Sequence, residues 1–140
     1  MDKLPDIELL NQDGHSIKTI EAWSGKELLI VFLSLYCKRC IELLPDLEKV
    51  KQHGLLLIVV TNGEVEENRD ISDHFGWDIP LISLNNNDMG EYFKVFETPT
   101  IQIYSKEGSL LSKGIINYAD DITFYVDSIG SKTTLGEVRE

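Results

Sequence analysis

Two cysteines, Cys37 and Cys40, are the residues of this chain whose spacing best suits covalent chemistry. They stand three positions apart, where a strongly apolar run ends and leucines begin to recur at helical spacing. At a helix N-terminus, unpaired N–H groups and the helix dipole stabilise an anion. We therefore expect Cys37 to be partly thiolate and to attack a sulfur atom. Cys40, one helical turn later and more buried, would resolve the resulting mixed disulfide.

Metal binding is the main alternative use of the pair. A structural zinc site needs four ligands, but there is no second cysteine pair, and His15, His53 and His74 show no ligand spacing. Two thiolates and a distant histidine suit Cu(I) better, and His74 is the candidate for that histidine. We therefore expect no metal at Cys37 and Cys40. A copper-carrying module remains the alternative.

The surrounding pattern is α/β. Apolar runs at 28–33 and 55–60 predict buried strands, the first in the middle of the sheet. A helix that contains Pro45 and ends near Gly54 would join them into a βαβ unit. Three further strand regions are expected: an edge strand at 4–10, a short strand at 80–84, and a hairpin of 100–104 with 110–116. Further helices are expected to carry residues 64–75, Met89 to Phe96, and Ile122 to Ile129. The aromatic residues Trp23, Trp77 and Tyr92 to Phe96 are expected to be mostly core, with Tyr36 and Trp77 as candidates for lining a groove.

Length and charge restrict the class of protein. The 140 residues suit one domain, which we place at 4–130, followed by a polar tail at 131–140 that we expect to fray. A net charge of -11 argues against nucleic acid as a partner. The longest apolar run, 28–36, is about half of what a membrane-spanning helix needs. The first residues carry no signal-peptide pattern, so the expected location is cytoplasmic, or extracytoplasmic if the N-terminus has been trimmed.

Cys37-Lys38-Arg39-Cys40, taken with the later Thr98-Pro99-Thr100, resembles the thioredoxin fold, and most closely the TlpA/ResA/MauD-like branch of thiol–disulfide oxidoreductases. The likeness covers most of residues 4–129 and includes Pro45 within the helix. It implies an α/β fold with a central mixed sheet, helices on both faces and an N-terminal strand extension. It also implies that Pro99 is a cis-proline facing the cysteines and that the backbone of Thr98 pairs with the substrate chain.

Several positions depart from that family. Tyr36 replaces a common tryptophan, and Lys38 and Arg39 replace the usual Gly-Pro or Pro-Pro. Positive charge beside Cys37 favours its thiolate, which predicts a moderately oxidising couple. The alternative is that both cations are solvated and screened.

The base that would deprotonate Cys40 is not identified by the pattern. Val31 stands where thioredoxins have a buried aspartate, and Leu43 stands where ResA-like proteins have a glutamate. Glu42 is one position away, which on a helix is a rotation of about 100°. Glu97, next to Thr98, is a candidate substitute.

Together these features predict a thiol–disulfide oxidoreductase without a cofactor. Its expected partners are a cysteine-containing protein or peptide and a thiol or disulfide that exchanges electrons with it. Tyr36, Lys38, Arg39, Thr98 and Pro99 are the predicted substrate-binding residues. The non-enzymatic alternatives are the copper carrier and a peptide-binding adaptor.

A peroxiredoxin is disfavoured. It would have a proline and a threonine ahead of its reactive cysteine, where this chain has Ile30 and Ser34.

Overall fold

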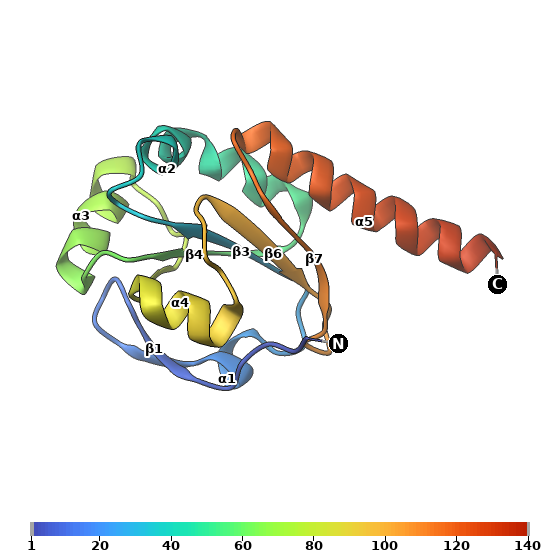
Figure 1. The fold of residues 1–140 in the computed structure, drawn as a ribbon, viewed down its shortest axis with the longest axis horizontal. Coiled ribbons are helices and arrows are strands. Elements are labelled where there is room, and N and C mark those ends of the chain that lie inside the picture. Colours follow the sequence, from blue (N-terminus) through green and yellow to red (C-terminus); the bar gives the residue numbers. More distant parts are fainter. Residues whose placement is uncertain (1, 140) are drawn as a thin grey trace.

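A computed structural model describes residues 2–139 and contains one seven-stranded mixed sheet in the order β2-β1-β5-β4-β3-β6-β7 (Figure 1). The strands are β1 (Glu8–Asn11), β2 (Ser16–Lys18), β3 (Leu28–Leu33), β4 (Leu56–Thr61), β5 (Leu81–Ser83), β6 (Thr100–Tyr104) and β7 (Leu110–Ile115). The helices are α1 (Thr19–Trp23), α2 (Lys38–Leu43), α3 (Val65–Phe75), α4 (Asn86–Phe93) and α5 (Ala119–Arg139), with a 3₁₀ segment, η1 (Leu44–His53), after α2.

Strand β3 is buried along its whole length, as its continuous apolar sequence predicts. It pairs in parallel with β4, from Leu28 opposite Leu56 to Leu33 opposite Thr61, and antiparallel with β6. The predicted βαβ unit and the hairpin of β6 and β7 are confirmed. Because β3 and β4 run in the same direction, their carboxyl ends meet at one edge of the sheet, and α2 and α3 begin near that edge.

The helix between β3 and β4 changes its character at Pro45. The sequence predicts one helix as far as Gly54, but α2 ends at Leu43 and the chain continues as η1. Proline has no N–H with which to donate to the carbonyl four residues earlier. The Leu44 N–H bonds instead to the carbonyl of Ile41, three residues back, which is the tighter 3₁₀ pattern.

The N-terminal strands differ from the expected edge strand at 4–10. Strand β1 begins at Glu8 and lies between β2 and β5, so it is not at an edge. The unpredicted strand β2 occupies that edge. These strands nevertheless form the predicted N-terminal extension of the sheet.

Helices cover both faces of the sheet (Figure 1). One apolar cluster includes Leu43, Leu47 and Ile122, from α2, η1 and α5, and the other includes Trp23, Met89 and Phe93, from α1 and α4. Helix α5 continues beyond the predicted end near Ile129, through the segment expected to be a tail, to Arg139. The division of the chain at residue 130 stays a prediction. None of the helices in the described residues has the length and apolar character needed to cross a bilayer.

Candidate active site

Cys37 lies at the N-terminus of α2, at the edge where β3 and β4 end. Its backbone is extended and it is the N-cap residue of the helix. The Cys40 N–H donates to the Cys37 sulfur at 3.2 Å, so this sulfur takes the place that a serine or aspartate oxygen commonly has at a helix start. The side chain is half-buried. Cys37 therefore combines access for a substrate with a backbone donor directed at its sulfur.

Cys40 is completely buried, with an exposed fraction of 0%. Burial is the largest cause that raises the pKa of its thiol to about 11, and the hydrogen bond with the Cys37 side chain raises it further. The Ser34 N–H, 3.4 Å from the Cys40 sulfur, and the Thr98 side chain lower it by smaller amounts. Both cysteines are free thiols in this structure. The two sulfurs thus differ sharply in their access to solvent, as the sequence predicts.

The peptide bond between Thr98 and Pro99 is cis. Pro99 is buried, and the carbonyl oxygen of Thr98 lies 3.8 Å from the Cys37 sulfur. The structure therefore brings Thr98 and Pro99, which are distant from the cysteines in the sequence, to the same site.

Ser34 and Asn62 hold the loop before Cys37, a role that was not predicted for either residue. The Ser34 hydroxyl accepts hydrogen bonds from the Tyr36 N–H at 3.2 Å and from the Asn62 side chain at 3.1 Å. The Asn62 carbonyl oxygen in turn accepts from the Leu35 N–H at 2.8 Å. A signal for the pair exists in the sequence, because each residue directly follows one of two neighbouring parallel strands.

A hollow of about 310 Å³ lies beside Cys37. Cys37 and Thr98 line it together with Tyr36 and Phe96. Tyr36 is 91% exposed, which fits its predicted place in a groove. Phe96 is 80% exposed, so its assignment to the core is wrong.

Two other aromatic predictions also change. Tyr92 is exposed rather than core, whereas Trp77 is core rather than groove-lining. The Trp77 ring stacks on Phe75, with 5.0 Å between the ring centroids.

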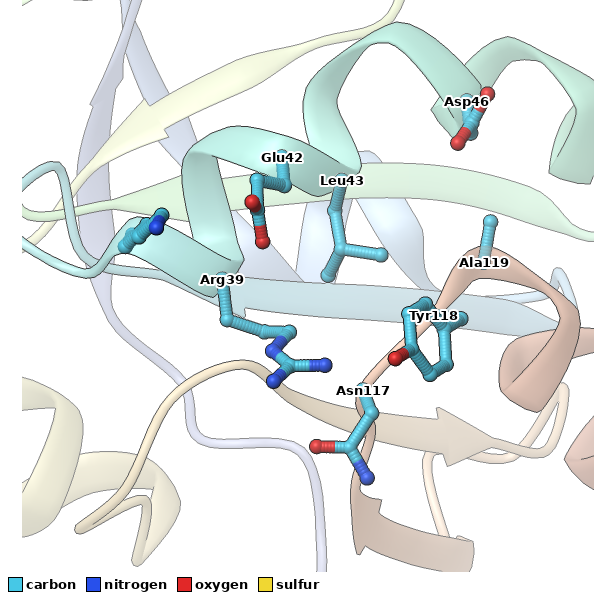
Figure 2. Close-up of a pocket in the computed structure, with 8 residues that line it drawn as sticks. Arg39, Glu42, Leu43, Asp46, Asn117, Tyr118 and Ala119 are labelled. Atoms are coloured by element: carbon cyan, nitrogen blue, oxygen red, sulfur yellow. The ribbon is translucent and has the colours of Figure 1, made fainter.

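Lys38 and Arg39 border a second hollow, of about 720 Å³, between α2 and the start of α5 (Figure 2). The guanidinium carbon of Arg39 lies 5.2 Å from the centre of the Tyr118 ring, within range of a cation–π contact. Figure 2 shows the Arg39 side chain reaching toward Tyr118 and Asn117. No sequence pattern marks Tyr118 for this position. It joins the residues between the two cysteines to the loop before α5.

The candidate bases do not reach Cys40. Val31 and Leu43 are buried apolar residues, and Glu42 is exposed in the second hollow. Glu97 is exposed in the first hollow, beside Thr98. Among the residues described, the ionisable side chain that influences Cys40 electrostatically is Cys37, and no carboxylate contributes.

Metal ligands do not gather around the cysteines. In the part of the chain that the structure describes, no three His, Cys, Asp or Glu side chains lie close enough to hold an ion. His74 lies in the last turn of α3, with its ring against Phe75. The structure therefore does not bring together the cysteines and the histidine of the copper alternative.

No family model matches this sequence, and no curated protein matches it either. Several solved structures are similar to it. The exposed lipoprotein thioredoxin of Streptococcus pneumoniae is 24% identical with a TM-score of 0.67, over 88% of this chain and 98% of that one. The thioredoxin domain of a Bacteroides vulgatus thiol–disulfide oxidoreductase is 21% identical with a TM-score of 0.71, over 91% and 94%. A Xanthomonas campestris peroxiredoxin Q mutant is 17% identical with a TM-score of 0.76, over 92% and 93%.

These likenesses show that the chain has the thioredoxin fold, which confirms the fold expected from the sequence. They are compatible with the TlpA/ResA/MauD-like branch.

Proposed function

We propose that the protein is a thiol–disulfide oxidoreductase that acts on a cysteine-containing protein or peptide. The observation that carries this proposal is the unequal environment of two sulfurs one helical turn apart. Cys37 is accessible and accepts a backbone hydrogen bond, whereas Cys40 is sealed beneath it. That division suits a nucleophile and a resolving thiol.

In the reducing direction, the Cys37 thiolate attacks one sulfur of a substrate disulfide. A bond forms between Cys37 and that sulfur, and the other substrate sulfur leaves as a thiolate. Cys40 then loses its proton to solvent and attacks the Cys37 sulfur, which releases the second substrate thiolate. The two released thiolates take up protons. The substrate gains two electrons, and the protein is left with a Cys37–Cys40 disulfide, which a thiol partner must reduce before the next turnover. Run backwards, the same steps oxidise a dithiol.

The remaining predicted site residues have supporting positions in this proposal. The Thr98 carbonyl beside Cys37 is available to accept a hydrogen bond from an extended substrate chain, and Pro99 holds that segment. Tyr36 would contact the substrate next to Cys37, and Lys38 and Arg39 would contact it on the side of the second hollow. The exchange as proposed needs neither a metal nor a cofactor.

A Cys40→Ser variant tests the proposal. With its resolving thiol removed, the protein should accumulate a mixed disulfide at Cys37 when mixed with a disulfide-bonded peptide, and mass spectrometry would identify the bond. Cys37→Ser is the matched control, because it keeps one thiol but should form no such adduct. An adduct on Cys40 in the control that matches the yield at Cys37 would overturn the assignment of roles. No adduct in either variant would overturn the proposed function.

The site does not favour a peroxidase, despite the fold shared with peroxiredoxin Q. Ser34, three residues before Cys37, uses its hydroxyl to hold Tyr36 and Asn62. Cytoplasmic location stays a prediction, since one solved neighbour is an exposed lipoprotein.

A further inference from the structure

Phe96 is a large apolar side chain that the fold turns outward. Helix α4 ends at Phe93, and its C-cap residue, Lys94, is the only non-glycine residue among those described with a positive φ, at 61°. Left-handed backbone is unfavourable for a residue with a side chain. The turn is closed by the Val95 N–H, which donates to the carbonyl of Met89 at 3.1 Å. The turn buries Val95 and leaves Phe96 80% exposed. The backbone of this segment is therefore held by hydrogen bonds, but no other described part of the chain covers the Phe96 side chain.

Gly90 provides the place where the Phe96 ring lies. A Cβ at residue 90 would stand 2.8 Å from one ring carbon of Phe96, which is too short for a carbon–carbon contact, and 3.2 Å from the next, which is tight. Glycine inside a helix destabilises it by about 0.5–1 kcal/mol relative to alanine. Here the missing side chain lets the edge of the Phe96 ring rest on the backbone of α4. The ring is exposed to solvent, and one of its edges lies against Gly90.

That position belongs to the same hollow as Cys37. Phe96 lines the hollow of about 310 Å³ with Tyr36, Cys37 and Thr98, and its inner wall includes Met89. In an extended peptide, neighbouring residues are about 3.3 Å apart along the chain. Alternate side chains of an extended peptide lie on the same face, so a side chain two positions from a cysteine held at Cys37 faces the hollow that Cys37 and Phe96 line together.

On the basis of the proposed function, we propose that Phe96 is a specificity-determining residue. It binds an apolar or aromatic side chain two positions from the substrate's reactive cysteine. Gly90 is the positioning residue that holds the ring there. The occupant of the hollow is the flanking part of the same peptide whose sulfur reacts, because Cys37 and Thr98 themselves line the hollow.

The experiment compares two synthetic peptides, each with one cysteine and each oxidised to its disulfide-linked dimer. They differ at the residue two positions from the cysteine, which is Phe in one and Ser in the other. The measured quantity is the rate constant for reaction of the reduced protein with each disulfide. Contacts between aromatic rings lead us to expect the Phe peptide to react roughly threefold to tenfold faster.

Three variants isolate the cause. Phe96→Ala should bring the ratio of the two rate constants to about one. Gly90→Ala should lower it as well, because the ring is retained but displaced, and circular dichroism would check that α4 is intact. Phe124→Ala removes another exposed phenylalanine, on α5, and should keep the wild-type ratio.

The outcomes separate this inference from the function on which it rests. Reaction with neither peptide would overturn the proposed function. Equal rates with both peptides, or an equal fall for both in Phe96→Ala, would overturn the specificity assigned to Phe96 while leaving disulfide exchange in place. A wild-type ratio in Gly90→Ala would overturn the positioning role of Gly90.

Discussion

The backbone N–H of Cys40 lies 3.2 Å from the Cys37 sulfur, while the Cys40 sulfur itself points into the protein, 3.4 Å from the Ser34 N–H. One residue therefore supplies a donor to the accessible sulfur and buries the second sulfur behind it. Because of this arrangement, we expect attack by Cys37 on the substrate and resolution by Cys40 to differ in their dependence on pH.

Resolution by Cys40 should accelerate with pH. Burial, which is the largest cause of the raised Cys40 pKa of about 11, persists in a mixed disulfide. The Cys40 thiolate fraction, and with it the rate, should then rise about tenfold per pH unit between pH 7 and 9. Reaction of the reduced protein with a chromogenic aryl disulfide would show this as a second release of aryl thiolate.

Cys40→Ser is the control for that measurement and should show the first release alone. A second phase independent of pH would contradict the prediction and indicate a base within reach of Cys40.

Asn62→Ala should both destabilise the protein and slow exchange. It removes the acceptor of the Leu35 N–H and the donor to the Ser34 hydroxyl, so the loop leading to Cys37 loses its brace. Loss of these hydrogen bonds should lower the free energy of unfolding by about 1–3 kcal/mol, measured with urea. Asn87→Ala, at an exposed position on α4, is the control and should stay within about 0.5 kcal/mol of wild type. Equal effects of the two substitutions would contradict the assigned brace.

Stability of the reduced protein should fall in alkali. The folded-state pKa of Cys40 is raised from 9.0 to about 11, mainly by burial. Burial likewise raises the pKa of Tyr104 above its ordinary value of 10.0, and the charge of Asp2 adds to the shift. A raised pKa gives stability that is complete below the unfolded-state pKa and is lost as pH rises through the folded-state value.

Cys40 should therefore account for a loss of roughly 2–3 kcal/mol between pH 9 and 11. Urea unfolding across that range, with a non-thiol reductant present, measures the loss. In Cys40→Ala the decline should be shallower and should come from the remaining groups, Tyr104 among them. Parallel declines in wild type and variant would rule out the contribution assigned to Cys40.

The reduction potential of the Cys37–Cys40 couple should be less negative than thioredoxin's, which is about -270 mV. Lys38 and Arg39 place positive charge next to Cys37, which favours the reduced form when its sulfur is anionic. A tenfold preference corresponds to about 30 mV, so replacing both residues with alanine should make the potential more negative by about that amount. Equilibration with glutathione buffers measures it. A wild-type value near -270 mV would show that solvent screens both cations.

A separate variant tests how Arg39 is held. Tyr118→Ala removes the ring under its guanidinium, 5.2 Å away. If this contact fixes the charge near the site, the potential should move in the same direction as in the double substitution. A shift in the opposite direction would contradict that role.

Much of the architecture was predictable from local patterns. The continuous apolar residues of β3 and β4 require that other elements cover both faces of these strands. The cysteine pair, which lies at the start of the helix that follows β3, indicated the edge of the sheet at which the reactive site lies. The positions of Pro99 and Thr98 followed from the family resemblance. These features could be predicted because they depend on residues adjacent in sequence or on a short motif.

Tertiary structure alone decided how distant side chains complete the site. Phe93 and Phe96 have the same residue type and neighbouring positions, yet the first is buried in the core and the second faces solvent. Nothing in periodicity distinguishes them, because the left-handed turn at Lys94 and the space above Gly90 determine which way each ring points. Asn62 meets Ser34 because β4 lies beside β3, and Tyr118 meets Arg39 because the start of α5 lies beside α2. The sequence by itself determined the reactive pair and the fold that carries it, whereas packing between distant segments decided what surrounds the pair.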